Sequence, residues 1–278
     1  ATSARMVTLR TLKFLTGPDL GVPSLTFRAW HEAQYGKRSW EDLVRITREE
    51  WMRYLVWFRE TLHLPVRNAV RLKRIEPRGD YLALHLLGHG GAEIMLTRKL
   101  VLATGIDGAG TQRVPDFVCD KLPRSAWAHT SDAIDMAALA GRRIAVIGGG
   151  ASAFDNAATA LESGAARVDV FIRRTELPVA NSYRALESAG FWRNFGDMPD
   201  AQRWRFMCHL LSLPMPPPQD TLQRTQRHAN GALHFAAPVL DAAVVADGIR
   251  LRTPNGWHAA DFPDPGYRLH RRPGATTG

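Results

Sequence analysis

A glycine-rich turn between two apolar segments constrains this chain more than any other feature. Residues 143–147 form a short apolar run that is typical of a buried strand, and three glycines follow at 148–150. The alanine-rich segment 153–163 has high helix propensity, and a second β-branched run covers residues 168–172. Strand, tight turn, helix and strand within about 30 residues predict a βαβ unit and therefore an α/β fold class.

The turn has the pattern of a dinucleotide-binding fingerprint, Gly148-x-Gly150-x-x-Ala153. Gly148 permits the tight turn, Gly150 lets the backbone approach a pyrophosphate, and Ala153 lets the helix pack close to the sheet. Free N–H groups and the positive end of the helix then favour bound phosphate. We predict that the pyrophosphate is held by Gly148, Gly149, Gly150, Ser152 and Ala153. A glycine-rich turn without a ligand is the alternative.

The second strand of the unit ends in Ile172-Arg173-Arg174. A site for NAD would have a carboxylate there, which accepts a hydrogen bond from the ribose 2′-hydroxyl. Two arginines instead match a 2′-phosphate, so Arg173 and Arg174 favour NADPH as the cofactor. Alternatively, the two arginines are simply basic side chains at a strand end that are exposed to solvent and bind no ligand.

Upstream of the turn, the chain is expected to contain short elements. Residues 1–38 show no regular pattern, whereas apolar side chains at three- and four-residue spacing predict one helix over about 41–62. The segment 70–97 is interpreted as an antiparallel meander of three strands. A buried strand is expected at 100–105, and the Gly, Pro and Asp content of 106–126 is typical of a linker.

Downstream of the turn, a helix is predicted over 199–213 and a second meander over 233–262. That meander is expected to begin with a strand at 233–239. The tail 263–278 is polar and contains prolines that would break a strand ladder, so it cannot form a core strand. We interpret it as an aberrant tail translated out of frame, a hypothesis that the coding DNA tests.

Composition excludes several classes of function. The formal net charge is +9, but the basic residues are scattered with no run of five or more, so no nucleic-acid partner is predicted. The two cysteines, Cys119 and Cys208, lie too far apart for a CxxC pair, and no metal site is predicted. No apolar run approaches the ~20 residues that span a bilayer. Because no signal peptide is visible either, we expect a cytoplasmic chain without a membrane partner.

Three stretches together resemble the class B flavin-dependent monooxygenases, which include flavin-containing, Baeyer–Villiger and N-hydroxylating enzymes. They are KLVLATG at 99–105, GRRIAVIGGGASAFDNAATAL at 141–161 and DVFIRR at 169–174. The resemblance implies a Rossmann-like NAD(P)H-binding domain with a β-meander at 119–262. It also implies a partial FAD-binding domain with a helical segment at 1–118. The GxGxxG motif that opens such enzymes is absent, so the chain is expected to be a fragment without it.

By this resemblance the chain is an NADPH- and FAD-dependent oxidoreductase of the monooxygenase type that acts on a small molecule. In the family, NADPH reduces the flavin, and the reduced flavin activates O2 for oxygen transfer. Two alternatives stay open: a flavin reductase or dehydrogenase that does not oxygenate, and a non-catalytic remnant that binds NADP(H). The Baeyer–Villiger fingerprint is not matched. No catalytic residue is assigned, and the oligomeric state is not predicted.

The resemblance adds candidate binding residues outside the glycine turn. Ala103, Thr104 and Gly105 would end a strand whose backbone passes close to the cofactor. His129 has two readings, a contact on the nicotinamide side or a loop histidine with partners of its own. Asp155 and Asn156, on the helix after the turn, are similar to family residues but fit a solvent-facing helix surface equally well.

Overall fold

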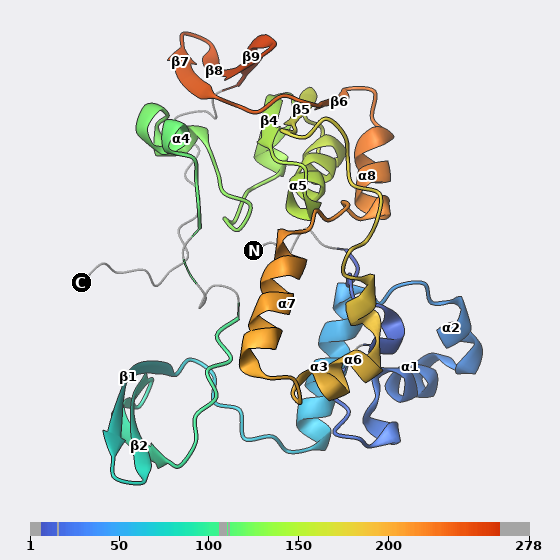
Figure 1. Ribbon diagram of the computed structural model, residues 1–278, viewed down its shortest axis with the longest axis vertical. Coiled ribbons are helices and arrows are strands. Elements are labelled where there is room, and N and C mark those ends of the chain that lie inside the picture. The colour runs from blue at the N-terminus through green and yellow to red at the C-terminus, as the bar shows by residue number, and fades with distance from the viewer. Residues whose placement is uncertain (1–6, 16, 106–109, 111, 262–278) are drawn as a thin grey trace. The chain divides into compact units, whose positions relative to one another are not determined.

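The computed structural model describes residues 7–15, 17–105, 110 and 112–261. Its helices are α1 Phe27–Tyr35, α2 Lys37–Asp42, α3 Arg48–Thr61, α4 Asp116–Lys121, α5 Ala151–Glu162, α6 Ala189–Phe195, α7 Asp200–Ser212 and α8 Gln219–Gln226 (Figure 1). Its strands are β1 Arg71–Arg78, β2 Tyr81–Gly88, β3 Gly91–Thr97, β4 Arg143–Ile147, β5 Arg167–Phe171, β6 Gly231–His234, β7 Asp241–Val245, β8 Gly248–Thr253 and β9 Gly256–Ala260. The chain divides into two compact units. One combines the residues up to Trp51 with those from Val114 onward, and the other is Met52–Arg113.

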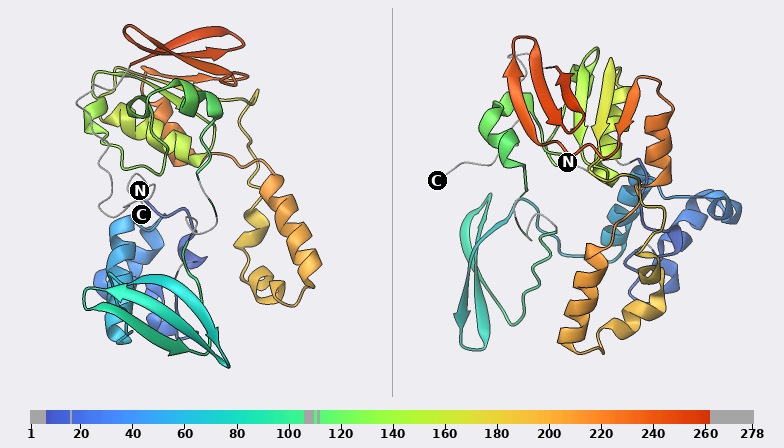
Figure 2. Two further views of the ribbon diagram at one scale, coloured as in Figure 1. Left: turned by 90° about the vertical axis from the view of Figure 1, so that its left-hand side faces the viewer. Right: turned by 45° about the horizontal axis from the view of Figure 1, so that its top comes forward.

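A three-stranded parallel sheet forms the centre of the first unit, in the order β4-β5-β6 (Figure 2). β4 pairs with β5 from Arg143↔Arg167 to Ile147↔Phe171, and β5 pairs with β6 up to Phe171↔His234. Because all three strands run in the same direction, their carboxyl ends lie at one edge of the sheet. This is the edge at which open α/β sheets bind ligands.

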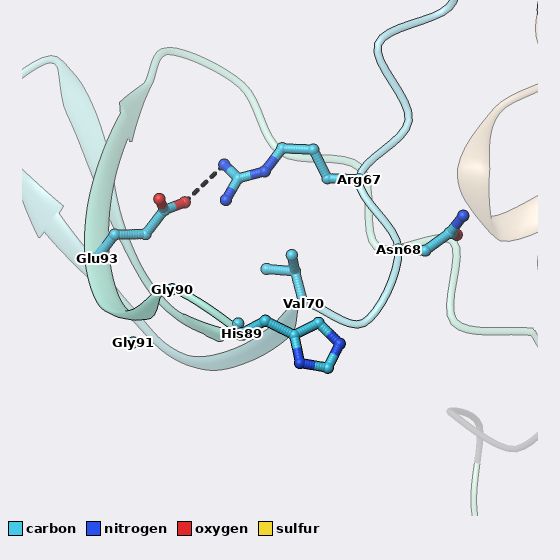
Figure 3. A pocket seen from close by; sticks show the side chains of 8 residues that line it. Arg67, Asn68, Val70, His89, Gly90, Gly91 and Glu93 are labelled. Atoms are coloured by element: carbon cyan, nitrogen blue, oxygen red, sulfur yellow. Dashed lines mark hydrogen bonds and ion pairs between the residues drawn. The ribbon is translucent and has the colours of Figure 1, made fainter.

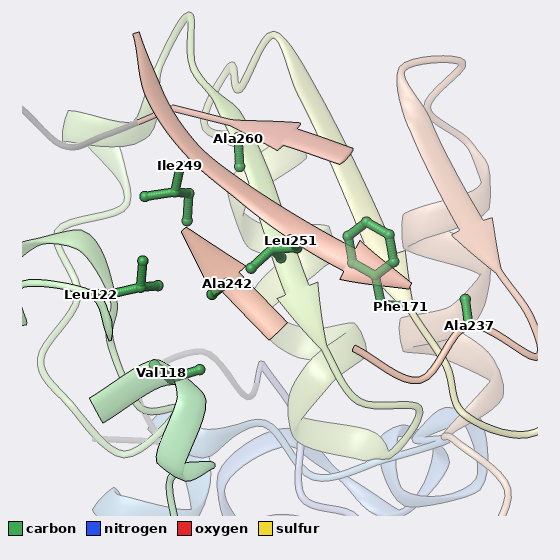
Figure 4. Packing of buried hydrophobic residues seen from close by; sticks show 8 residues of the cluster. All are labelled: Val118, Leu122, Phe171, Ala237, Ala242, Ile249, Leu251 and Ala260. Carbon is green, nitrogen blue, oxygen red and sulfur yellow. The ribbon is translucent and has the colours of Figure 1, made fainter. Parts of the chain in front are cut away.

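The two faces of the parallel sheet are covered by different layers. Val168 and Val170 of β5 pack with Phe154 and Leu161 of α5, and Leu222 of α8 joins the same cluster. Phe171, whose side chain lies on the other face of β5, belongs to a second cluster with residues of the meander β7-β8-β9 and of α4 (Figure 4). Side chains of a strand alternate between faces, so β5 supplies both cores. The α/β class, the βαβ unit and the meander with its Asp247-Gly248 and Asn255-Gly256 turns are confirmed.

Helix α5 is held against α8 by contacts near both of its ends. It begins after Gly150, and Gly164 follows its end with a φ of +88°, a conformation that glycine adopts without strain. Near its carboxyl end, Glu162 accepts two hydrogen bonds from Arg224 of α8. Thr225 of α8 is buried and donates to the Phe154 carbonyl of α5. These contacts fix the direction in which the amino end of α5 points.

The helices near the amino terminus correct two predictions. The expected single helix over 41–62 is wrong, because α2 and α3 are separate helices, and the expected irregular segment 1–38 contains α1. α3 starts at a capping box: Thr47 Oγ1 accepts from the Glu50 N–H, and Glu50 Oε2 accepts from the Thr47 N–H and hydroxyl. Thr47 also forms a β-bridge with Thr8, which holds it in an extended conformation and interrupts the helix.

The second unit contains the antiparallel sheet β1-β2-β3, as predicted. The register is regular except for an irregularity between Leu72 and Arg74. Beside the β2–β3 turn lies a shallow pocket lined by polar groups and glycines, in which Arg67 and Glu93 form an ion pair at 2.6 Å (Figure 3). The opposite charges of Arg67 and Glu93 in the lining of this pocket thus neutralise each other.

Three further predictions are wrong. Residues 100–105 form no strand, and Val101 and Leu102 are 86% and 59% exposed, because the described residues place no neighbouring strand beside them. The expected linker 106–126 contains α4. The strand expected at 233–239 as part of the meander is β6, which pairs in parallel with β5, since α8 returns the chain to the start of the sheet. The predicted tail 263–278 lies outside the described residues.

Candidate nucleotide-binding site

The turn between β4 and α5 is fixed to the end of β5 by its first glycine. Gly148 has a φ of +136°, which side chains other than glycine rarely adopt. Its N–H donates to the Phe171 carbonyl at 3.0 Å, so the ladder between β4 and β5 continues into the turn. A Cβ on Gly148 would lie 3.5 Å from the Ala153 Cβ, so the start of α5 sits directly against the turn.

The other two glycines have different surroundings. A Cβ on Gly149 would lie 2.9 Å from Ile172 Cγ2, closer than side chains normally approach, so packing against Ile172, the residue after β5, requires glycine at position 149. A Cβ on Gly150 would meet no atom within 4 Å. Gly150 therefore leaves an open space directly at the amino end of α5, which a methyl group would partly fill and a phosphate can approach.

Among the described residues, no side chain caps the N–H groups at the amino end of α5. Gly150 is the N-cap residue and makes no side-chain hydrogen bond. The first N–H groups of a helix have no partner within the helix, and the helix dipole adds positive potential at this end. The turn thus meets the chemical requirements for a diphosphate: open space, free N–H donors and positive potential.

Arg173 and Arg174 follow β5 at the same edge of the sheet as the glycine turn. Both are exposed, whereas the preceding Ile172 is buried. Within the described part of the chain, neither guanidinium has a recorded hydrogen bond or ion pair. The backbone of Arg174 is held in place, because its carbonyl accepts from the Ala236 N–H at 2.7 Å. The pair is thus positioned by its backbone and has donors available for an anion.

Asp155 and Asn156 are buried, at 8% exposure each, so the reading of a solvent-facing helix surface is wrong for both. The Asp155 carboxylate forms an ion pair with Arg10 and accepts a hydrogen bond from Thr221. Asn156 donates from Nδ2 to the Ser152 carbonyl at 2.7 Å. Its Oδ1 is buried without a hydrogen-bond partner among the described residues.

His129 lies in a loop with polar partners of its own. Its ring Nδ1 is 2.6 Å from Ser131 Oγ, and its backbone N–H donates to the Asp132 carboxylate, which Arg124 also contacts. This arrangement agrees with the reading of a loop histidine whose Nδ1 is engaged. Ala103, Thr104 and Gly105 are exposed in irregular structure in the second unit. Roles for these four residues at a cofactor stay predictions.

Sequence reasoning missed a polar cluster on the face of β5 opposite α5. Asp169 is buried and accepts two hydrogen bonds from Arg167 and one from His234. Burial alone would raise the pKa of Asp169, but these hydrogen bonds outweigh it and hold the pKa below its ordinary value. Phe171 stacks on His234, with ring centroids 4.9 Å apart, and meets His258 edge-on. Burial and the nearby His234 lower the pKa of His258.

This cluster supports the strand end that anchors the glycine turn, because Phe171 supplies both the stacked ring and the carbonyl that binds Gly148. The period-two pattern of β5 offered a signal for it, since it places Arg167, Asp169 and Phe171 on one face. Among the described residues, no group of three or more His, Cys, Asp or Glu side chains could hold a metal ion. No helix in those same ranges has the length and apolar character needed to cross a membrane.

Comparison with known proteins places this site in context. The family model described as L-lysine 6-monooxygenase/L-ornithine 5-monooxygenase matches residues 39–205. A protein named FAD-dependent urate hydroxylase, from Xanthomonas campestris pv. campestris, is 49% identical over 261 residues. That match covers 94% of this chain and 55% of the relative, so the chain spans about half the length of that curated protein.

Solved structures share the fold. The reduced form of ornithine hydroxylase from Pseudomonas aeruginosa superposes with a TM-score of 0.69 at 21% identity, covering 97% of this chain and 73% of that one. L-lysine 6-monooxygenase from Pseudomonas syringae superposes with a TM-score of 0.61 at 18% identity, covering 86% and 62% of the two chains. At these identities the superpositions show a common architecture.

Proposed function

The chain belongs to the L-lysine 6-monooxygenase/L-ornithine 5-monooxygenase family, and on that premise we propose that it forms the NADPH-binding part of a flavin-dependent monooxygenase. This family assignment confirms the resemblance to class B flavin-dependent monooxygenases that the sequence motifs indicated. We propose the domain organisation predicted from the sequence, a partial FAD-binding domain at 1–118 and an NAD(P)H-binding domain at 119–262. A cytoplasmic location and the absence of nucleic-acid and membrane partners stay predictions.

The single observation that supports NADPH most strongly is that an open glycine turn and two exposed arginines lie at one sheet edge. Gly150 leaves space at the amino end of α5, and Arg173 and Arg174 follow the adjacent strand. In the proposal, the turn and Ser152 and Ala153 bind the pyrophosphate through backbone N–H groups. The two guanidinium groups bind the 2′-phosphate through charge-assisted hydrogen bonds.

FAD is the second cofactor of the proposed function, and it is supported by the family. When bound, NADPH supplies a hydride and FAD passes the reducing equivalents on to O2. The printed sequence carries one dinucleotide fingerprint, at Gly148–Ala153, which we assign to NADPH. The residues of this chain that would contact FAD are not assigned.

For the substrate we propose urate or a closely related purine. The support is the 49% identity to a protein named FAD-dependent urate hydroxylase, across 94% of this chain. The description of the family model would instead suggest the side-chain amine of lysine or ornithine. Oxygenation of urate, lysine and ornithine can be compared by following NADPH oxidation together with loss of each substrate.

Purification followed by an absorbance scan and a titration with NADP+ and NAD+ tests the proposal. We expect NADP+ to bind more tightly than NAD+. Bound flavin with NADPH oxidation but no oxygenated product would favour a reductase or dehydrogenase. NADP+ binding without any flavin, even after addition of FAD, would favour a non-catalytic remnant. Absence of NADP+ binding would overturn the proposal.

A further inference from the structure

The ladder between β5 and β6 ends in a bulge that the glycine fingerprint does not explain. The Ile172 N–H donates to the His234 carbonyl at 2.9 Å, so a regular parallel ladder would return from the Ala236 N–H to the Ile172 carbonyl. The Ala237 N–H makes that bond instead, at 2.9 Å, while the Ala236 N–H donates to the Arg174 carbonyl. One extra residue is therefore inserted opposite Ile172.

The bulge holds a residue in an unfavourable backbone conformation. Ala236 has a φ of +48°, a region that alanine rarely occupies. The residues on either side of the bulge are anchored, because His234 contacts Asp169 and Ala237 is buried. Between these anchors, Phe235 is 36% exposed. Bulges of this kind re-aim side chains, and strained conformations gather at functional sites.

Phe235 lies at the edge of the sheet where the proposed dinucleotide site is found. β4, β5 and β6 are parallel neighbours, so the glycine turn, Arg173-Arg174 and Phe235 follow three adjacent carboxyl ends. Neighbouring strands are about 4.8 Å apart. In NADPH the order of groups is pyrophosphate, ribose 2′-phosphate and adenine. A dinucleotide whose pyrophosphate lies at β4 and whose 2′-phosphate lies at β5 brings its base to β6.

We propose that Phe235 is the residue on which the adenine of the dinucleotide stacks, and that the bulge at Ala236 exists to present it. The inference rests on the proposed NADPH site and adds a base-recognition residue to it. An aromatic face binds the base through stacking, which contributes independently of the charge contacts to the phosphates. Phe235 therefore contributes to affinity for NADP+ and NAD+ alike, whereas Arg173 and Arg174 separate the two.

The test is the affinity of the purified chain for NADP+, measured by calorimetry for wild type and variants. Phe235→Ala is expected to weaken NADP+ binding about ten- to a hundred-fold, the range of one base–aromatic stacking contact. Phe235→Leu, which keeps an apolar side chain without an aromatic face, is expected to bind NADP+ nearly as weakly as Phe235→Ala does. Phe235→Trp is expected to bind like wild type. The control is Trp204→Ala, an exposed aromatic on α7, which should leave affinity unchanged.

A spectroscopic readout separates stacking from a general structural effect. The adenine absorbance of 2′,5′-ADP, which has no nicotinamide to stack on its own base, should fall on binding to wild type and to Phe235→Trp, and should fall much less with Phe235→Leu. Wild-type affinity in both Phe235→Ala and Phe235→Leu would overturn the inference while leaving the proposed NADPH site intact. If the wild-type chain does not bind NADP+ at all, the proposed function fails, and the assignment of Phe235 fails with it.

Discussion

Replacement of Gly149 by alanine tests whether the turn is packed as tightly against Ile172, the residue after β5, as the structure indicates. The added Cβ would lie 2.9 Å from Ile172 Cγ2 and 3.5 Å from Cγ1. Carbon atoms in contact are normally about 3.5 Å apart or more, so the overlap is about 0.6 Å. Ile172 is 1% exposed and branched at Cβ, so its side chain cannot rotate out of the way easily.

The expected cost of Gly149→Ala is about 1–3 kcal/mol in the free energy of unfolding, the range for overpacking a tight core. For a chain of this size, thermal denaturation should show a fall in Tm of about 2–4 °C per kcal/mol. Gly190→Ala in α6 is the matched control, because a Cβ there would make only an ordinary contact, 3.6 Å from Ser188 Oγ. We expect that control to keep or raise the Tm, since alanine favours a helix.

A double-mutant cycle identifies the cause of the loss. Ile172→Ala removes Cγ2 and should cost about 2–5 kcal/mol in the wild-type background, because it empties a buried site. In the Gly149→Ala background, Ile172→Ala should lower the free energy of unfolding by about 1–3 kcal/mol less, because it also removes the atom that the new Cβ overlaps. The packing reasoning is refuted if Gly149→Ala leaves the Tm unchanged, or if Ile172→Ala costs the same in both backgrounds.

Two further predictions concern the ends of the strands. Ala236→Val should lower the free energy of unfolding by about 1–3 kcal/mol, because a β-branched residue is strained at a φ of +48°. Ala236→Gly should retain the wild-type stability, because glycine adopts this conformation without strain. Equal denaturation midpoints for the two variants would contradict the backbone conformation assigned to Ala236. For His258, the lowered pKa means that, as the pH falls below about 6.5, the unfolded chain takes up a proton before the folded chain does, so stability should fall. The charged or titratable groups that act on His258 are His234, Asp169 and Arg167. His258→Gln should reduce the loss of stability between pH 7.5 and 5.5. If the denaturation midpoint of this variant depends on pH as it does in wild type, the assignment of the effect to His258 is contradicted.

Local patterns with one dominant cause were predictable from the sequence. The glycines at 148–150, the alanine-rich helix and the β-branched run at 168–172 each act through short-range geometry, and the structure places them as expected. The turns at Asp247-Gly248 and Asn255-Gly256 belong to the same class. For the candidate site, this was enough to identify the turn, and it placed the two arginines on the correct strand end.

Features that depend on pairing between distant segments were not predictable in the same way. The apolar spacing over 41–62 continues through Thr47, where the capping box with Glu50 and the bridge to Thr8 interrupt the helix. The direction of β6 depends on its neighbour, because alternation alone does not separate a parallel strand from an antiparallel one. The bulge at Ala236 arises from hydrogen bonds to Ile172 and Arg174, which a single sequence does not reveal.

The affinities of the chain for NADP+ and NAD+, compared between wild type and the Arg173→Ala/Arg174→Ala double variant, test the proposed site most directly. Charge-assisted hydrogen bonds contribute about 1.5–3 kcal/mol, so wild type should bind NADP+ at least about tenfold more tightly than NAD+. The double variant should lose that preference while its affinity for NAD+ stays the same. A double variant that still prefers NADP+ by the wild-type margin would contradict the assignment of the 2′-phosphate to these arginines.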